Sequence, residues 1–148
     1  MPKTSGEQTF MNTIEGNRPM LDAYGRIATI SYTPKIVAKT AAYTVVAADS
    51  GTIFTTVGAT AAVTFTLPAI STGPWAFKFI CGADVGMTVA AATADTMLTM
   101  NDAAADSIAF NTTAERIGGT VEVYCDGTTL IGLARMATEA QTPTIATN

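Results

Sequence analysis

Residues 120–136 read Thr-Val-Glu-Val-Tyr-Cys-Asp-Gly-Thr-Thr-Leu-Ile-Gly-Leu-Ala-Arg-Met, and this stretch has the pattern of a β-hairpin. In its first half Val121, Val123 and Cys125 recur at every second position, which is the period of a strand with one buried face. The dipeptide Asp126-Gly127 follows, and it favours a type I′ turn because both central residues of that turn need positive φ. The sequence therefore predicts strands over 120–125 and 128–136, joined by a two-residue turn.

The same period recurs upstream of the hairpin. The apolar faces that it defines are Trp75, Phe77, Phe79 and Cys81 in one segment, and Val63, Phe65 and Leu67 in another. Both cysteines, Cys81 and Cys125, fall on these faces, where free thiols are common. We expect two buried, reduced thiols, with a disulfide between them as the alternative.

Turn signals separate short apolar runs at the spacing of an all-β sandwich or barrel. The strand candidates are residues 43–46, 52–57, 62–67, 75–81, 87–91, 96–100 and 107–110. One helical turn near 102–105 is the most helix that the alanine clusters allow. We therefore predict an all-β fold, a small β-sandwich or jelly-roll-like barrel. Its expected core includes Val45, Val63, Phe65, Leu67, Phe77, Phe79, Val121, Val123 and Leu133.

The chain divides into three parts on these patterns. Residues 1–35 form an N-terminal arm and a first strand (25–32), residues 36–136 form the β domain, and residues 137–148 form a flexible C-terminal tail. The first 22 residues carry isolated apolar side chains without a strand or helix period, so they are either a disordered tail or an extended arm that orders against a neighbour.

Composition argues against several functions. The chain has no histidine, 14% charged residues and a net charge of −4, and its eight basic residues form no cluster. These features exclude Ser-His-Asp and Cys-His catalysis and argue against a nucleic-acid partner. No apolar stretch is long enough to span a bilayer, and the N-terminus lacks the apolar core of a signal peptide. We expect a non-enzymatic protein without cofactor or metal, made in the cytoplasm and with no membrane partner.

The acidic and glycine-containing motifs are interpreted as turns and loops. Asp49-Ser50-Gly51 fits a β-turn better than a nucleophile loop. Asp95, Asp102 and Asp106 do not form the loop pattern of a calcium site, so a solvated loop is expected. Gly118-Gly119 is expected to permit a bulge or turn into the last hairpin.

Three segments together resemble a pattern frequent in tailed-bacteriophage virion proteins. They are Tyr-Thr-Val-Val-Ala-Ala-Asp-Ser-Gly-Thr-Ile-Phe at 43–54, Ala-Val-Thr-Phe-Thr-Leu-Pro at 62–68, and Gly-Gly-Thr-Val-Glu-Val-Tyr-Cys-Asp-Gly-Thr at 118–128. A short chain with an N-terminal arm is similar to capsid decoration proteins, which cement the shell. The resemblance implies a place on the outer capsid surface of the virion, the major capsid protein as partner, and a homotrimer. The alternatives are a receptor- or glycan-binding module of a phage tail or head fibre, and a bacterial surface adhesin.

The candidate contact residues are chosen from the sequence pattern of the arm and not from the resemblance. Six side chains in the arm have no periodic partner within the chain, and we expect them to contact the capsid: Phe10, Met11, Ile14, Arg18, Met20 and Leu21.

Overall fold

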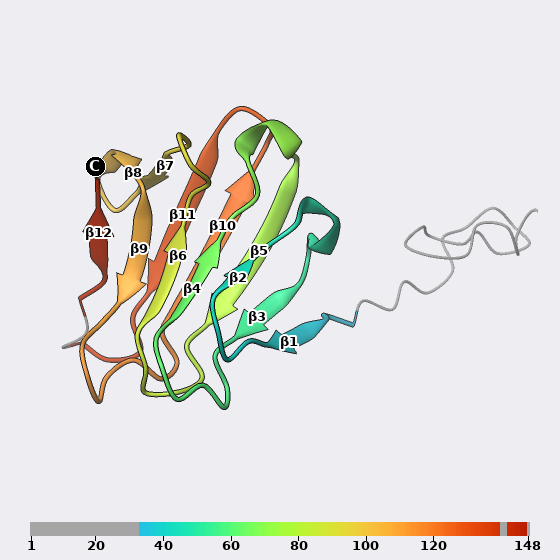
Figure 1. Ribbon diagram of the computed structural model, residues 1–148. Coiled ribbons are helices and arrows are strands. Elements are labelled where there is room, and N and C mark those ends of the chain that lie inside the picture. Colours follow the sequence, from blue (N-terminus) through green and yellow to red (C-terminus); the bar gives the residue numbers. More distant parts are fainter. Residues whose placement is uncertain (1–32, 140–141, 148) are drawn as a thin grey trace, which may run out of the picture. The chain divides into compact units, whose positions relative to one another are not determined.

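The strand periods of the sequence appear as two β-sheets that pack face to face (Figure 1) in the computed structural model, which describes residues 33–139 and 142–147. The first sheet has seven strands in the order β1 (Ile36–Ala38), β3 (Ile53–Thr55), β5 (Trp75–Ile80), β10 (Thr120–Cys125), β11 (Leu130–Arg135), β7 (Met97–Thr99) and β8 (Asp102–Ala105). The second has five in the order β12 (Thr144–Ala146), β9 (Ser107–Phe110), β6 (Met87–Ala90), β4 (Val63–Thr66) and β2 (Tyr43–Thr44). The prediction of an all-β sandwich is confirmed.

Helix is confined to two short 3₁₀ turns in the described part of the chain. They are η1 (Ala47–Asp49), between β2 and β3, and η2 (Ile70–Thr72), between β4 and β5. None of the described residues forms a helix long and apolar enough to cross a membrane.

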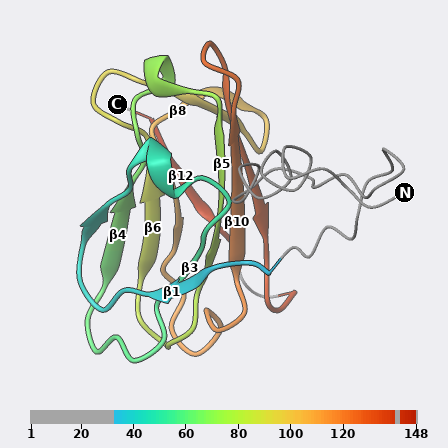
Figure 2. The same cartoon turned by 90° about the vertical axis from the view of Figure 1, so that its right-hand side faces the viewer.

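The first six strands alternate between the two sheets. Each connection carries the chain to the opposite layer, so β1, β3 and β5 pair in parallel in one sheet while β2, β4 and β6 pair in parallel in the other (Figure 2). Parallel neighbours need a crossover connection, and here a strand of the other sheet supplies it. Antiparallel pairing first appears between β7 and β8, and it continues with β9 on β6 and with β10 on β5. The sandwich is therefore mixed, and its first half lacks the antiparallel order of a jelly roll.

Aromatic rings from both sheets meet at the centre of the sandwich. Phe54 and Phe79 stack with centroids 5.7 Å apart, and Phe65 reaches them from the other sheet at 5.9 and 4.9 Å. A ring of this kind buries roughly 150–250 Å², so this trio contributes much of the stability of the sandwich. Eight of the nine predicted core residues are buried: Val45, Val63, Phe65, Leu67, Phe77, Phe79, Val121 and Val123.

The ninth predicted core residue, Leu133, was assigned to the wrong face. Leu133 is 51% exposed, and the inward positions of β11 are Leu130, Gly132 and Ala134. A Cβ on Gly132 would lie 2.8 Å from Ile108 Cδ1 and 2.9 Å from Met97 Sδ, so the inward space at this position is already filled from elsewhere. Because alternate residues of a strand face opposite sides, the inward Leu130 and Gly132 place Leu133 outward.

The last hairpin is present, but its turn differs from the predicted one. Cys125 pairs with Leu130, so the loop has four residues, 126–129, and only Gly127 of the Asp-Gly dipeptide has positive φ (96°). Asp126 Oδ1 accepts the backbone N–H groups of Thr128 and Thr129, both at 2.7 Å. These two side-chain bonds favour a wider turn over the two-residue type I′ turn.

Two further expectations are corrected. Residues 102–105 form strand β8 rather than a helical turn, because they pair with β7. The C-terminal segment was expected to be a flexible tail, but residues 144–146 form β12 on the edge of β9, with Ile145 packed against the core. Tertiary pairing overrides weak local propensity in both places. The strand expected over residues 25–32 lies outside the described residues.

Both cysteine side chains are buried and free, as predicted for reduced core thiols. Trp75, Phe77 and Phe79 also point into the core from β5, which confirms the face assigned to that strand. Gly118 has positive φ (93°) and lies in the turn that enters β10, where its N–H donates to the carbonyl of Cys81. The Gly-Gly pair thus permits the turn that was expected there.

Candidate interaction surface

The outward face of the seven-stranded sheet carries most of the large apolar side chains that strands expose to solvent. A continuous cross-strand row runs over five strands, because the registers pair Ile36 with Ile53, Ile53 with Lys78, Lys78 with Glu122, and Glu122 with Leu133. We call these five residues the central row. A second row beside it joins Tyr124, Ile131 and Leu98.

Five of the eight side chains in these two rows are well exposed, whereas Ile53, Lys78 and Glu122 are partly buried. The relative exposure is 64% for Ile36, 51% for Leu133, 45% for Tyr124, 43% for Leu98 and 40% for Ile131. Single exposed aliphatic residues are ordinary, whereas a connected group of them marks an interaction site. The two rows together, called the outer apolar face below, are therefore the candidate site of this protein.

The centre of the outer apolar face is an ion pair. Lys78 Nζ lies 3.2 Å from Glu122 Oε1, and the Tyr124 hydroxyl donates to Glu122 Oε2 at 3.1 Å. The hydrogen bond from Lys78 lowers the pKa of the Glu122 carboxyl, and the bond from Tyr124 adds to this effect. The same bond to Glu122 raises the pKa of Tyr124. The face thus combines aliphatic side chains with a neutralised charged centre.

The outward face of the five-stranded sheet has a different chemistry. Its two cross-strand rows contain only small side chains: Thr44, Thr66, Ala90, Ser107 and Ala146 in one, and Thr64, Thr88, Ala109 and Thr144 in the other. These hydroxyl and methyl groups are compatible with water and expose no large apolar area. The asymmetry of the sandwich means that one sheet, not both, presents a surface suited to a protein partner.

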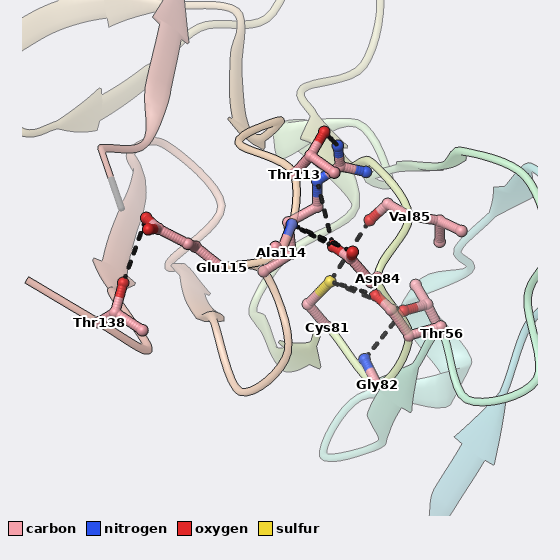
Figure 3. Close-up of polar contacts among 11 residues, drawn as sticks. Thr56, Cys81, Gly82, Asp84, Val85, Thr113, Ala114, Glu115 and Thr138 are labelled. Carbon is pink, nitrogen blue, oxygen red and sulfur yellow. Dashed lines mark hydrogen bonds and ion pairs between the residues drawn. The ribbon is translucent and has the colours of Figure 1, made fainter. Parts of the chain in front are cut away.

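A cluster of polar contacts at one end of the sandwich ties three loops together (Figure 3). Both oxygens of Asp84, in the β5–β6 loop, accept the N–H of Ala114, at 2.9 and 3.1 Å. Arg116 donates to Thr113 at 2.8 Å, and its Nε lies 3.8 Å from Asp84 Oδ1 without a hydrogen-bond partner. The arrangement anchors the long β9–β10 loop to its neighbour.

Cys81 belongs to the same cluster but is not an activated nucleophile. Its Sγ lies 3.9 Å from Thr56 Oγ1 and 3.3 Å from the carbonyl of Ala83 (Figure 3). Burial raises the pKa of this thiol above its ordinary value, and the hydrogen bonds only partly oppose that effect. A reactive cysteine needs the opposite shift. The contacts of Thr56, which also accepts the N–H of Gly82 at 2.9 Å, indicate a role in holding the loops.

The acidic residues singled out in the sequence do not converge. Asp95 accepts the N–H of Ile70 at 2.8 Å, and Asp102 accepts the Thr147 hydroxyl at 2.7 Å and the N–H of Ala104 at 2.8 Å. Within residues 33–139 and 142–147, no group of three or more His, Cys, Asp or Glu side chains is placed to hold a metal ion. Asp95 and Asp102 thus serve as acceptors for neighbouring turns and strands.

The predicted contact residues of the arm lie outside the described residues: Phe10, Met11, Ile14, Arg18, Met20 and Leu21. The outer apolar face, in contrast, was not recognised in the sequence. One signal in the sequence could have found it. Gly132 lies between Ile131 and Leu133, and a glycine at that place indicates that it faces the crowded core while its two aliphatic neighbours face outward.

A comparison of the chain with protein-family models, with curated proteins and with solved structures finds no match in any of the three. The assignment to a phage family thus stays a prediction from sequence.

Proposed function

We propose that this protein is a non-enzymatic structural protein that acts by binding other protein surfaces. The observation that carries this proposal is the outer apolar face, on which exposed aliphatic side chains of several strands are contiguous while the opposite face is small and polar. Apolar area removed from water contributes about 25 cal/mol per Å², and a partner that covers such a face can use this free energy to offset the cost of association. A rigid two-sheet scaffold suits that role because the face is held in one shape.

The partner that we propose is the major capsid protein of a tailed bacteriophage. Support comes from the resemblance of residues 43–54, 62–68 and 118–128 to decoration proteins. In this role the protein lies on the outer surface of the virion and bridges neighbouring capsid subunits, so that more contacts must break before the shell opens. The arm residues Phe10 to Leu21 would add anchors of about 1.5–3 kcal/mol for each large apolar side chain that becomes buried.

Co-sedimentation tests this role. Expanded capsids assembled from the major capsid protein of the same genome are incubated with the full chain and with a variant lacking residues 2–21. We expect the full chain to pellet with capsids, and the truncated chain to bind more weakly by orders of magnitude while melting at nearly the same temperature. A full chain that stays in the supernatant would contradict the capsid role, and equal binding by the truncated chain would assign the contact to the β-sandwich.

A glycan-binding module of a phage fibre is the second candidate. One observation favours it: Tyr124 is an exposed aromatic residue whose hydroxyl is bonded to Glu122, and sugars bind against such rings beside polar groups. Trp75, in contrast, is buried and cannot serve as a stacking platform. Binding to a glycan array that is lost in Tyr124→Ala, without capsid binding, would favour this second function. The position of the gene, beside capsid or beside tail genes, also separates the two.

A further inference from the structure

The four inner residues of the central row, from Ile53 on β3 to Leu133 on β11, have a symmetric order. Across the sheet the whole row reads aliphatic, aliphatic, Lys, Glu, aliphatic, with the ion pair Lys78–Glu122 on the two adjacent strands β5 and β10. On either side of that pair lie Ile53 of β3 and Leu133 of β11. A surface with this order is complementary to a copy of itself.

From this order we propose that a second copy of the chain docks on the outer apolar face, with a two-fold axis running along the strands midway between β5 and β10. This inference rests on the proposed function, because it keeps the claim that the outer apolar face binds protein and names a second copy of the chain, instead of the capsid, as the occupant of that face.

The two-fold operation pairs the charges correctly. Rotation about that axis exchanges the positions of β5 and β10, so Lys78 of one copy lies opposite Glu122 of the other, and the reverse contact forms at the same time. It also exchanges β3 with β11, so Ile53 lies opposite Leu133. An interface in which the same patch serves both subunits is the commonest kind in homo-oligomers, and it closes without further growth.

The size of the face is sufficient for a stable contact. Strands about 4.8 Å apart make a seven-stranded sheet about 30 Å wide, and the six-residue strands β5, β10 and β11 are about 20 Å long. Two such faces together bury on the order of 1,000 Å², which is the area that a specific interface needs. Sheets that pack face to face keep their strands within about 30° of each other, which agrees with an axis along the strands.

Charge swaps test the proposed geometry more sharply than apolar changes do. Lys78→Glu gives a face with two central acids, and Glu122→Lys gives one with two central bases, so each variant repels its own copy. Mixed in equal amounts, the two variants place opposite charges against each other. We expect K78E and E122K alone to self-associate at least tenfold more weakly than the unaltered chain, and the mixture to recover a heterodimer. An effect on folding alone would not be repaired by mixing.

Sedimentation equilibrium of the full chain measures these states. We expect the unaltered protein at twice 15.3 kDa, Leu133→Glu at 15.3 kDa, and the control Thr64→Glu, which adds the same charge to the opposite face, at twice 15.3 kDa. Circular dichroism verifies that each variant keeps its strands. An unaltered chain at 15.3 kDa or at three times that mass would overturn the proposal, the latter in favour of the trimer implied by the phage resemblance. A dimer that survives both Leu133→Glu and the charge swaps would overturn it as well.

Capsid binding is scored separately, so that the two proposals can fail independently. A monomer that still pellets with capsids, and loses this binding in Leu133→Glu, would overturn the two-fold contact and assign the face to the capsid. A dimer that does not pellet with capsids would support the two-fold contact and contradict the capsid role.

Discussion

Gly73 and Gly127 lie so close that their loops meet backbone to backbone. A Cβ on Gly73 would be 2.6 Å from the backbone nitrogen of Gly127 and 2.9 Å from Cys125 Sγ. The contact fixes the loop before β5 against the loop between β10 and β11, next to the carbonyl of Ile70, which lies 3.5 Å from Cys125 Sγ. Two distant segments of the chain are therefore brought together at a point where only glycine fits.

Gly73→Ala should destabilise the protein by about 1–3 kcal/mol, the range for inserting a carbon atom where backbone atoms cannot yield. The matched control is Gly132→Ala, where the facing atoms are the mobile ends of Ile108 and Met97 and can shift. Urea unfolding followed by circular dichroism measures both changes. Equal losses in the two variants would contradict the backbone contact.

The two leucines of β11 should differ strongly in their contribution to stability. Leu130 is 1% exposed, so Leu130→Ala removes a buried side chain and should cost about 2–5 kcal/mol. Leu133→Ala lies on the outward face and should change the free energy of unfolding of the monomer by less than about 0.5 kcal/mol. Both are measured below the concentration at which the chain associates. A larger loss of stability for Leu133→Ala would mean that Leu133 faces the core and that the inward and outward faces of β11 are assigned wrongly.

Cys81 should make stability depend on pH at the alkaline end. Burial raises the pKa of the folded thiol above the ordinary value of 9.0, so the unfolded chain ionises first as pH rises. The stabilisation is complete below pH 9 and is lost as pH rises through the folded pKa. Urea unfolding at pH 8 and above pH 10 should therefore show a steeper decline for the unaltered chain than for Cys81→Ala. Parallel declines would indicate an exposed thiol, which rapid alkylation of the native protein would also reveal.

Strand β12 should protect the edge of the five-stranded sheet. Its removal, by deletion of residues 142–148, takes away the partly buried Ile145 and the bond from Thr147 to Asp102, and it opens the backbone edge of β9. Partial burial of one isoleucine is worth about 1 kcal/mol, and an open edge favours association of sheets. We expect a lower midpoint of urea unfolding, followed by circular dichroism, and faster aggregation on heating, followed by light scattering. Thr144→Ala, with an exposed side chain in the same strand, serves as the control and should behave like the unaltered chain.

The sequence predicted the fold class and most of the core because these depend on local alternation. The two rings of Phe77 and Phe79 alternate with the charge of Lys78. Only one orientation of β5 buries the rings and exposes the charge, so its inward face is determined without knowledge of the neighbouring strands. Asp126-Gly127 likewise determined that the chain turns between two strands. It did not determine the kind of turn, because the side chain of Asp126 bonds to two N–H groups farther along and widens the loop.

Tertiary structure alone decided which strands are neighbours, and with that which outward residues form a surface. No local signal tells that β1, β3 and β5 run parallel through crossovers in the opposite sheet, or that β12 completes the edge of β9. Leu133 faces outward because Ile108 and Met97, which come from other strands, already fill the inward space beside Gly132. The central row exists only through this pairing: Ile36, Ile53, Lys78, Glu122 and Leu133 are scattered over nearly 100 residues, and cross-strand hydrogen bonds, rather than proximity in the chain, place them side by side.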